Sequence, residues 1–184
     1  MSSYKFRVLL DSSAKEDIFR DIQIANTATY EDFYKAILNA FSFGGNQMAS
    51  FYLSNDDWDK GFEITYMDMG NNDELDEPTA IMSSHKLADF VSKKKQKLIL
   101  VHDFMRMWIF LIELVEISDA TVEQPTVVLS VGNAPAEDSK EIDKNFQFGD
   151  DDLDFDDETY GDDDFNDDDF DMDDLNDFDD FDDN

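Results

Sequence analysis

The sequence predicts an α+β protein: one mostly antiparallel sheet of about six strands, packed with one long and one short helix and followed by a disordered acidic tail. Three features of the sequence indicate this. Apolar and polar residues alternate over residues 4–11 and 18–25, as in half-buried strands. Residues 29–41 have the apolar spacing of a helix. Residues 98–117 (LILVHDFMRMWIFLIELVEI) contain two apolar runs broken by polar residues, which is typical of a hairpin in the middle of a sheet.

The first two segments predict an antiparallel hairpin joined by the polar turn DSSAKED at residues 11–17. The side of the first strand expected in the core carries Tyr4, Phe6, Val8 and Leu10. The second strand alternates Ile18, Arg20, Ile22 and Ile24 with Phe19, Asp21 and Gln23.

A helix is predicted to follow this hairpin. Thr29 is a suitable N-cap, and Glu31 and Asp32 place negative charge in the first turn, where the helix dipole favours it. The pair Gly44-Gly45 is expected to end the helix, because glycine adopts the backbone conformations found past a helix C-terminus.

Shorter elements are predicted in the remainder of the domain. They are strands at residues 48–53, 62–67 and 126–131, a loop at 69–78, and a short helix capped by Ser83 or Ser84 and running through 87–91. In the central hairpin both faces of residues 107–114 are apolar. This strand should therefore lie in the middle of the sheet and be covered on both sides.

Negative charge is concentrated at the end of the chain. Of the formal net charge of −32, residues 1–133 contribute −9 and residues 134–184 contribute −23. Residues 149–184 hold 21 Asp or Glu and no Lys or Arg, and their apolar residues recur mainly every five positions, which suits neither helix nor strand. We therefore expect a globular domain at 1–136 and a disordered tail at 137–184. Such a polyanion repels nucleic acid and anionic membranes and attracts basic partners.

Several classes of site are not expected. The absence of cysteine excludes disulfides, thiol nucleophiles and cysteine-ligated metals, and His85 is the only histidine besides His102. No phosphate-binding glycine motif or serine elbow occurs. The apolar run near the N-terminus is too short to be the core of a signal peptide. The six apolar residues before Glu113 are far fewer than the roughly 20 that span a bilayer. We expect a soluble cytoplasmic protein with no cofactor, no metal and no direct contact with nucleic acid.

Several short motifs, in order, resemble the plasmid pRiA4b ORF-3-like family. In its first half the family has a W-R-R-I-type second strand, a helix ending near A-F-G-W and a strand around H-L-Y-x-F. In its second half it has a Y-x-Y-D-F-G-D-x-W segment followed by a buried glutamate, and then a G-x-x-P-P-E-D piece. The matching pieces here are Phe19-Arg20-Asp21-Ile22, Ala40-Phe41-Ser42-Phe43, residues 48–51, residues 101–108 with Glu113, and residues 132–137 (GNAPAE). The family's Trp is Phe19 here, its first-helix His is lost, and its turn Gly-Asp is Met105-Arg106. The resemblance spans residues 4–138 and implies no reaction. It does imply a bacterial context, since some members are carried on mobile elements.

His102 and Asp103, beside Arg106 and Trp108, form the most suggestive cluster. A neighbouring carboxylate can orient and charge an imidazole for proton transfer. In the alternative, which we favour, Asp103 accepts backbone hydrogen bonds within the hairpin turn.

Arg20 and Glu113 are charged residues within apolar strands. A functional pair would line a pocket, whereas a structural pair would form a salt bridge that adds little stability. The structural interpretation is favoured here as well.

The acidic tail carries regularly placed aromatic residues. They are Phe155, Tyr160, Phe165, Phe170, Phe178 and Phe181. The spacing of its carboxylates does not fit an EF-hand. The tail suits capture of a basic protein, with the rings inserting as nucleic-acid bases would, or it acts only as a solubilising segment.

Together these features predict a non-catalytic interaction module whose tail binds a basic protein partner. One alternative is a small-ligand-binding protein or enzyme with a pocket near Asp103 and His102. Another is a tail that only solubilises the protein or folds back on Lys93–Lys97 in autoinhibition.

Overall fold

The computed structural model describes residues 2–68 and 80–142. Residue contacts divide the chain into units Met1–Phe148 and Gly149–Asn184, and all described residues belong to the first. Its elements are β1 (Ser3–Leu10), β2 (Ile18–Ala25), α1 (Tyr30–Phe41), β3 (Ala49–Ser54), β4 (Lys60–Thr65), β5 (Ala80–Ile81), α2 (Leu87–Phe90), β6 (Lys97–His102), β7 (Trp108–Ser118), β8 (Thr126–Val131) and the 3-10 helix η1 (Glu137–Ser139). The α+β class is confirmed.

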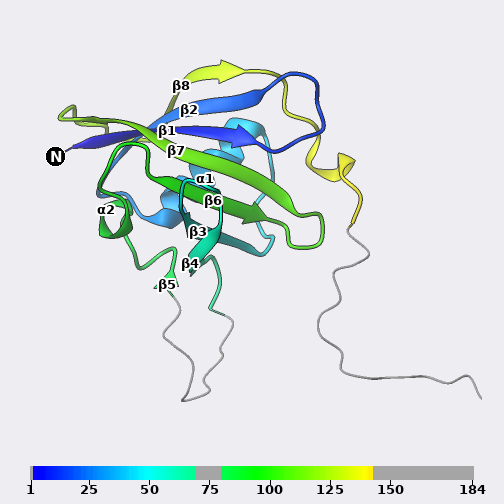
Figure 1. The fold of residues 1–184 in the computed structure, drawn as a ribbon, viewed down its shortest axis with the longest axis horizontal. Coiled ribbons are helices and arrows are strands. Elements are labelled where there is room, and N and C mark those ends of the chain that lie inside the picture. The colour runs from blue at the N-terminus through cyan, green and yellow to red at the C-terminus, as the bar shows by residue number, and fades with distance from the viewer. Residues whose placement is uncertain (1, 69–79, 143–184) are drawn as a thin grey trace, which may run out of the picture. The chain divides into compact units, whose positions relative to one another are not determined.

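The sheet has eight strands, more than the six expected, in the order β5-β4-β3-β6-β7-β1-β2-β8 (Figure 1). All neighbouring strands are antiparallel except β4 and β5, which are parallel. No predicted strand corresponds to β5, which has only two residues and is too short to produce a periodic signal in the sequence. The hairpin of β6 and β7 lies in the middle of the sheet, as predicted.

Helix α1 packs on one face of the sheet and supplies much of the core (Figure 1). Its N-terminus is the predicted one: the Thr29 hydroxyl accepts from the Asp32 amide, and the Asp32 carboxylate accepts from the Thr29 amide. The helix also ends at Phe41, as predicted, but the residue that terminates it is not Gly44 or Gly45. Ser42, with φ of 59°, adopts the left-handed conformation that we assigned to Gly44-Gly45, and its amide donates to the Asn39 and Leu38 carbonyls. A left-handed residue after a helix is usually glycine, but here the turn comes directly after Phe41, where the sequence has serine.

The short helix α2 begins later than predicted. Its N-cap is Lys86, not Ser83 or Ser84, and the Lys86 amide donates to the Asp89 carboxylate. The carboxylate at the third helical position therefore accepts from the N-cap amide, which is one half of a capping box, and no serine hydroxyl caps this helix.

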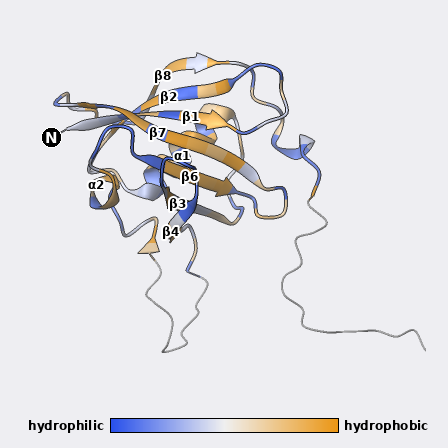
Figure 2. Ribbon diagram, in the orientation of Figure 1, coloured by the Kyte–Doolittle hydropathy of each residue, from blue (hydrophilic) through white to orange (hydrophobic). Residues whose placement is uncertain are grey.

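Only one face of β7 is buried, so the prediction of a strand covered on both sides is wrong. Figure 2 shows β7 as hydrophobic along most of its length. Trp108, Phe110, Ile112 and Leu114 are buried toward α1, whereas Ile109 and the other residues of the opposite face are half-buried.

No helix within residues 2–68 and 80–142 has the length and apolar character needed to cross a membrane.

Candidate functional site

The turn between β6 and β7 uses the Asp103 carboxylate for backbone hydrogen bonds. Asp103 Oδ1 accepts from the amides of Met105 (3.1 Å) and Arg106 (3.3 Å). Asp103 and Met107 both have positive φ, at 57° and 54°. Asp103 Oδ2 lies 3.5 Å from Arg106 Nε. The carboxylate thus stabilises the turn, as the structural interpretation expects, and does not contact the His102 ring nitrogens, which have other partners.

His102 is fully buried at the end of β6 and joins two distant side chains. Its Nδ1 lies 2.8 Å from the Tyr34 hydroxyl of α1, and its Nε2 lies 2.7 Å from Glu137 Oε1. Burial raises the pKa of Tyr34 well above its ordinary value, so its hydroxyl is neutral and able to donate to Nδ1. This arrangement leaves Nε2–H to donate to the Glu137 carboxylate.

Glu137 also contacts the chain after α1 and the strand β7. Its Oε2 accepts from the Gly44 amide at 2.6 Å, and its carbonyl oxygen accepts from Trp108 Nε1 at 3.0 Å. A Cβ at Gly44 would lie 3.1 Å from Oε2, so a glycine permits this close approach. Glu137 is therefore the residue through which the chain after β8 is attached to the rest of the domain.

Residues 137–140, which we call the latch segment, make further contacts with the β6–β7 turn. Arg106 Nη1 donates to the carbonyl oxygens of Lys140 (2.5 Å) and Asp138 (3.4 Å). Lys140 Nζ donates to the Met107 carbonyl and lies over the Trp108 ring, 5.3 Å from its centroid. The latch segment therefore packs on the domain, although the predicted tail began at residue 137.

Arg20 and Glu113 do not meet. Arg20 lies on the α1 side of the sheet, where it donates to the carbonyls of Ala40 (3.1 Å) and Val131 (2.7 Å). Glu113 alternates with the buried residues of β7 and lies on the opposite face, opposite Arg7 and Lys97 in the sheet register. Arg20 therefore joins α1 to β8, and Glu113 belongs to a row of surface charges.

Among the predicted site residues, the structure brings His102, Asp103 and Trp108 together at one end of the β6–β7 hairpin. The contacts through Tyr34 and Glu137 were not predicted. Helical spacing places Tyr34 beside the apolar stripe of the helix, and Glu137 ends the GNAPAE piece, but neither pattern indicates a contact with His102. The tail aromatics lie outside the described residues.

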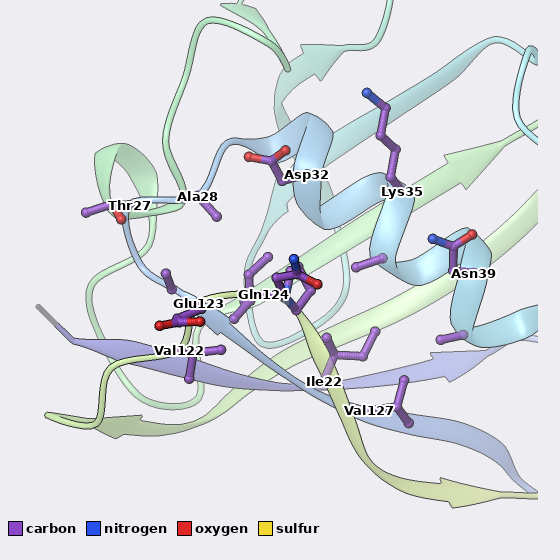
Figure 3. A pocket seen from close by; sticks show the side chains of 15 residues that line it. Ile22, Thr27, Ala28, Asp32, Lys35, Asn39, Val122, Glu123, Gln124 and Val127 are labelled. Atoms are coloured by element: carbon purple, nitrogen blue, oxygen red, sulfur yellow. The ribbon is translucent and has the colours of Figure 1, made fainter.

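A cleft of about 690 Å³ lies elsewhere, between α1, β2 and the start of β8 (Figure 3). Its charged lining residues include Asp32, which caps α1, and Lys35, which pairs with Glu31 at 2.5 Å. No group of three or more His, Cys, Asp or Glu side chains in the described part of the chain is arranged to hold a metal ion.

These observations define a class: a single-sheet α+β domain with a buried Tyr–His–Glu contact that attaches the chain after its last strand. The chain belongs to the plasmid pRiA4b ORF-3-like protein family, whose match covers residues 2–179. The match therefore extends past residues 4–138, which carry the motifs quoted above, into the acidic segment. No curated protein matches the chain. The fold is similar to that of MM3350, a protein of unknown function from Methanosarcina mazei Go1, with a TM-score of 0.61 and 22% identity over 76% of this chain and 75% of that one.

Proposed function

We propose that this protein is a non-catalytic interaction module that binds a basic protein partner through its acidic C-terminal segment, residues 149–184. The observation that carries the proposal is the charge of this segment, with 21 Asp or Glu and no Lys or Arg. A charge density of this kind attracts cationic surfaces and speeds their association.

The latch segment supports the same proposal. It precedes the acidic residues in the sequence, and the domain binds it through His102, Trp108 and Arg106. A domain whose polar groups hold the chain that leads into the acidic segment suits the role of a scaffold for that segment.

A catalytic function has less support. Asp103 is occupied by turn amides, His102 is fully buried between two partners, and Arg20 and Glu113 lie on opposite faces of the sheet. A general base must reach the proton that it removes. This set of side chains does not converge on one accessible point.

The test compares three full-length proteins as bait in a cell lysate, with captured proteins identified by mass spectrometry and their affinities measured after purification. The first is the natural chain. The second carries Asn and Gln in place of every Asp and Glu of residues 149–184. The third keeps those charges but replaces the six tail aromatics Phe155, Tyr160, Phe165, Phe170, Phe178 and Phe181 with Ser.

The natural chain should capture a basic protein, with an affinity that falls steeply between low and high salt, since exposed charges are screened over about 10 Å at 0.1 M. The neutralised chain should lose capture and keep the same melting temperature. A loss with the Ser variant, together with competition by duplex DNA, would indicate mimicry of nucleic acid. Salt-independent capture, or capture by the neutralised chain, would refute the proposal.

A further inference from the structure

Strand β8 is an open edge of the sheet. Among the described residues it pairs only with β2, so the backbone groups along its outer side have no strand partner. Unpaired edges of this kind are templates for another strand.

Four of the six side chains of β8 are apolar and exposed, and they lie on both faces of the sheet. Val127, Val128, Leu129 and Val131 are 37–48% exposed. Val127 lies opposite the buried Ile22, on the α1 side, whereas Leu129 lies opposite Asp21, on the other side. The register shift between these pairs adds a bulge to β8 but places no charge on it.

Natural edge strands are often protected from pairing with other chains by lysine, proline or a β-bulge, and of these three β8 has only the bulge, between Val127 and Leu129. Residues 107–139 contain neither lysine nor arginine, and Pro125 precedes β8 without entering it. The strand thus has the composition of one that accepts a partner.

The cleft between α1 and the sheet adjoins the start of β8 (Figure 3). Pro125 and Val127 line one side of it, and Ala36 and Ala40 of α1 line the other. If another strand pairs with β8, its side chain beside Val127 on the α1 face lies next to this cleft. An apolar side chain at that position can enter the cleft.

Acidic residues flank both ends of β8. Asp119 and Glu123 are exposed before it. At its other end Gly132 approaches Asp17, since a Cβ on the glycine would lie 2.7 Å from the Asp17 carbonyl oxygen. Glu16 and Asp17 are exposed there, with Lys15 offsetting one charge. The edge is therefore apolar in the middle and negative at the ends.

We propose that β8 is a strand-addition site for an extended segment of the cationic partner, with apolar residues in the middle of the segment and Lys or Arg at its ends. This inference deepens the proposed function and rests on it for the basic character of the partner. A second copy of the chain fits less well, because each copy carries a net charge of −32 and β8 has no basic residue to meet the acidic ends.

The test uses the full-length protein and a synthetic peptide probe of alternating Val and Thr flanked by lysines. A second peptide has the same sequence with N-methyl groups on alternate amides, so that one backbone edge cannot donate hydrogen bonds. Binding is measured by fluorescence anisotropy, and its location by amide chemical shifts. The unmodified peptide should shift the amides of residues 126–131 and bind at least about tenfold more tightly than the methylated peptide, a difference of about 1.4 kcal/mol.

Two protein variants complete the test. Val128→Lys places a charge on the edge and should weaken binding of the unmodified peptide at least about tenfold. Met105→Lys makes the same change at another exposed apolar residue, in the β6–β7 turn, and should leave binding within about twofold. Equal affinity for the two peptides, no effect of Val128→Lys, or a concentration-dependent dimer abolished by Val128→Lys would overturn the inference.

The outcomes also separate this inference from the proposed function. If Val128→Lys keeps capture of the lysate partner while the neutralised chain loses it, the acidic segment acts alone and strand addition fails. If the neutralised chain keeps capture while Val128→Lys loses it, the edge is the binding site and the role of the acidic segment fails.

Discussion

The imidazole of His102 and the carboxylate of Glu137, 35 residues apart in the chain, lie 2.7 Å apart between Nε2 and Oε1. The imidazole is fully buried, and the carboxylate is also bound by the Gly44 amide. This contact fixes the latch segment to the central hairpin.

Glu137→Ala should lower the free energy of unfolding by about 2 kcal/mol, because buried His102 and the Gly44 amide then lose a charged acceptor. Asp138→Ala is the matched control, since only its backbone carbonyl contacts Arg106, and its effect should stay within about 0.5 kcal/mol. Denaturant unfolding in a Trp58→Phe background, where Trp108 is the only tryptophan, gives the measurement. Equal losses for the two variants would contradict a specific latch.

Two tyrosines one turn apart on α1 should respond oppositely to replacement by Phe. The Tyr34 hydroxyl binds His102, so Tyr34→Phe should cost about 1 kcal/mol. The Tyr30 hydroxyl is buried and has no hydrogen-bond partner within the described part of the chain, so Tyr30→Phe should be neutral or stabilising by about 1 kcal/mol. Thermal and denaturant unfolding of both variants tests this. A larger loss for Tyr30→Phe than for Tyr34→Phe would show that the two hydroxyls are wrongly assigned.

Stability should fall at alkaline pH through the buried tyrosines. Burial raises the pKa values of Tyr30 and Tyr34 far above the ordinary value and raises that of Tyr52 to about 12. The stabilisation by neutral tyrosine is therefore complete below the unfolded pKa of about 10 and is lost as pH rises from there toward the folded values, because only the unfolded chain releases its protons. Unfolding free energies measured from about pH 8 to 11 should decline less steeply in the Tyr30→Phe/Tyr34→Phe double variant. The same slope in both proteins would contradict this cause.

Met107→Gly should be less harmful than the same change at Met105. Met107 has a φ of 54°, a conformation that costs an ordinary residue roughly 1 kcal/mol and costs glycine nothing. Met105 lies in the same turn without positive φ. Met107→Gly should therefore be the more stable variant by about 1 kcal/mol in denaturant unfolding. The reverse order would show that packing of the Met107 side chain outweighs the backbone term.

Arg20→Lys should loosen β8. The guanidinium donates to carbonyls of both α1 and β8, and one ammonium cannot reproduce this forked geometry. Hydrogen exchange should accelerate at the amides of β8 and the end of α1, while exchange in β6 stays unchanged. Uniform acceleration across the sheet would indicate a general loss of stability rather than a local contact.

Periodicity in the sequence predicted most of the strands and the long helix. Residues 18–25 and 126–131 coincide with β2 and β8, and Thr29 caps α1, because alternation and capping are local properties. Cap residues were less predictable: Ser42 ends α1 where Gly44-Gly45 was expected to do so, and Lys86 begins α2 where Ser83 or Ser84 was expected. A backbone turn or cap is decided by which hydrogen bonds the surrounding chain supplies.

The fold class, the family, the central place of the β6–β7 hairpin and the concentration of negative charge in residues 134–184 all follow from the amino-acid sequence. The contacts of His102 with Tyr34 and Glu137, the placement of Arg20 and Glu113 on opposite faces, and the position of β8 at one edge of the sheet emerged only in the folded domain. The two kinds of feature differ in how far apart the residues that produce them lie in the sequence. Hydrophobic patterns report which face of an element is buried, whereas contacts between residues far apart in the chain depend on strand order and on where each strand ends.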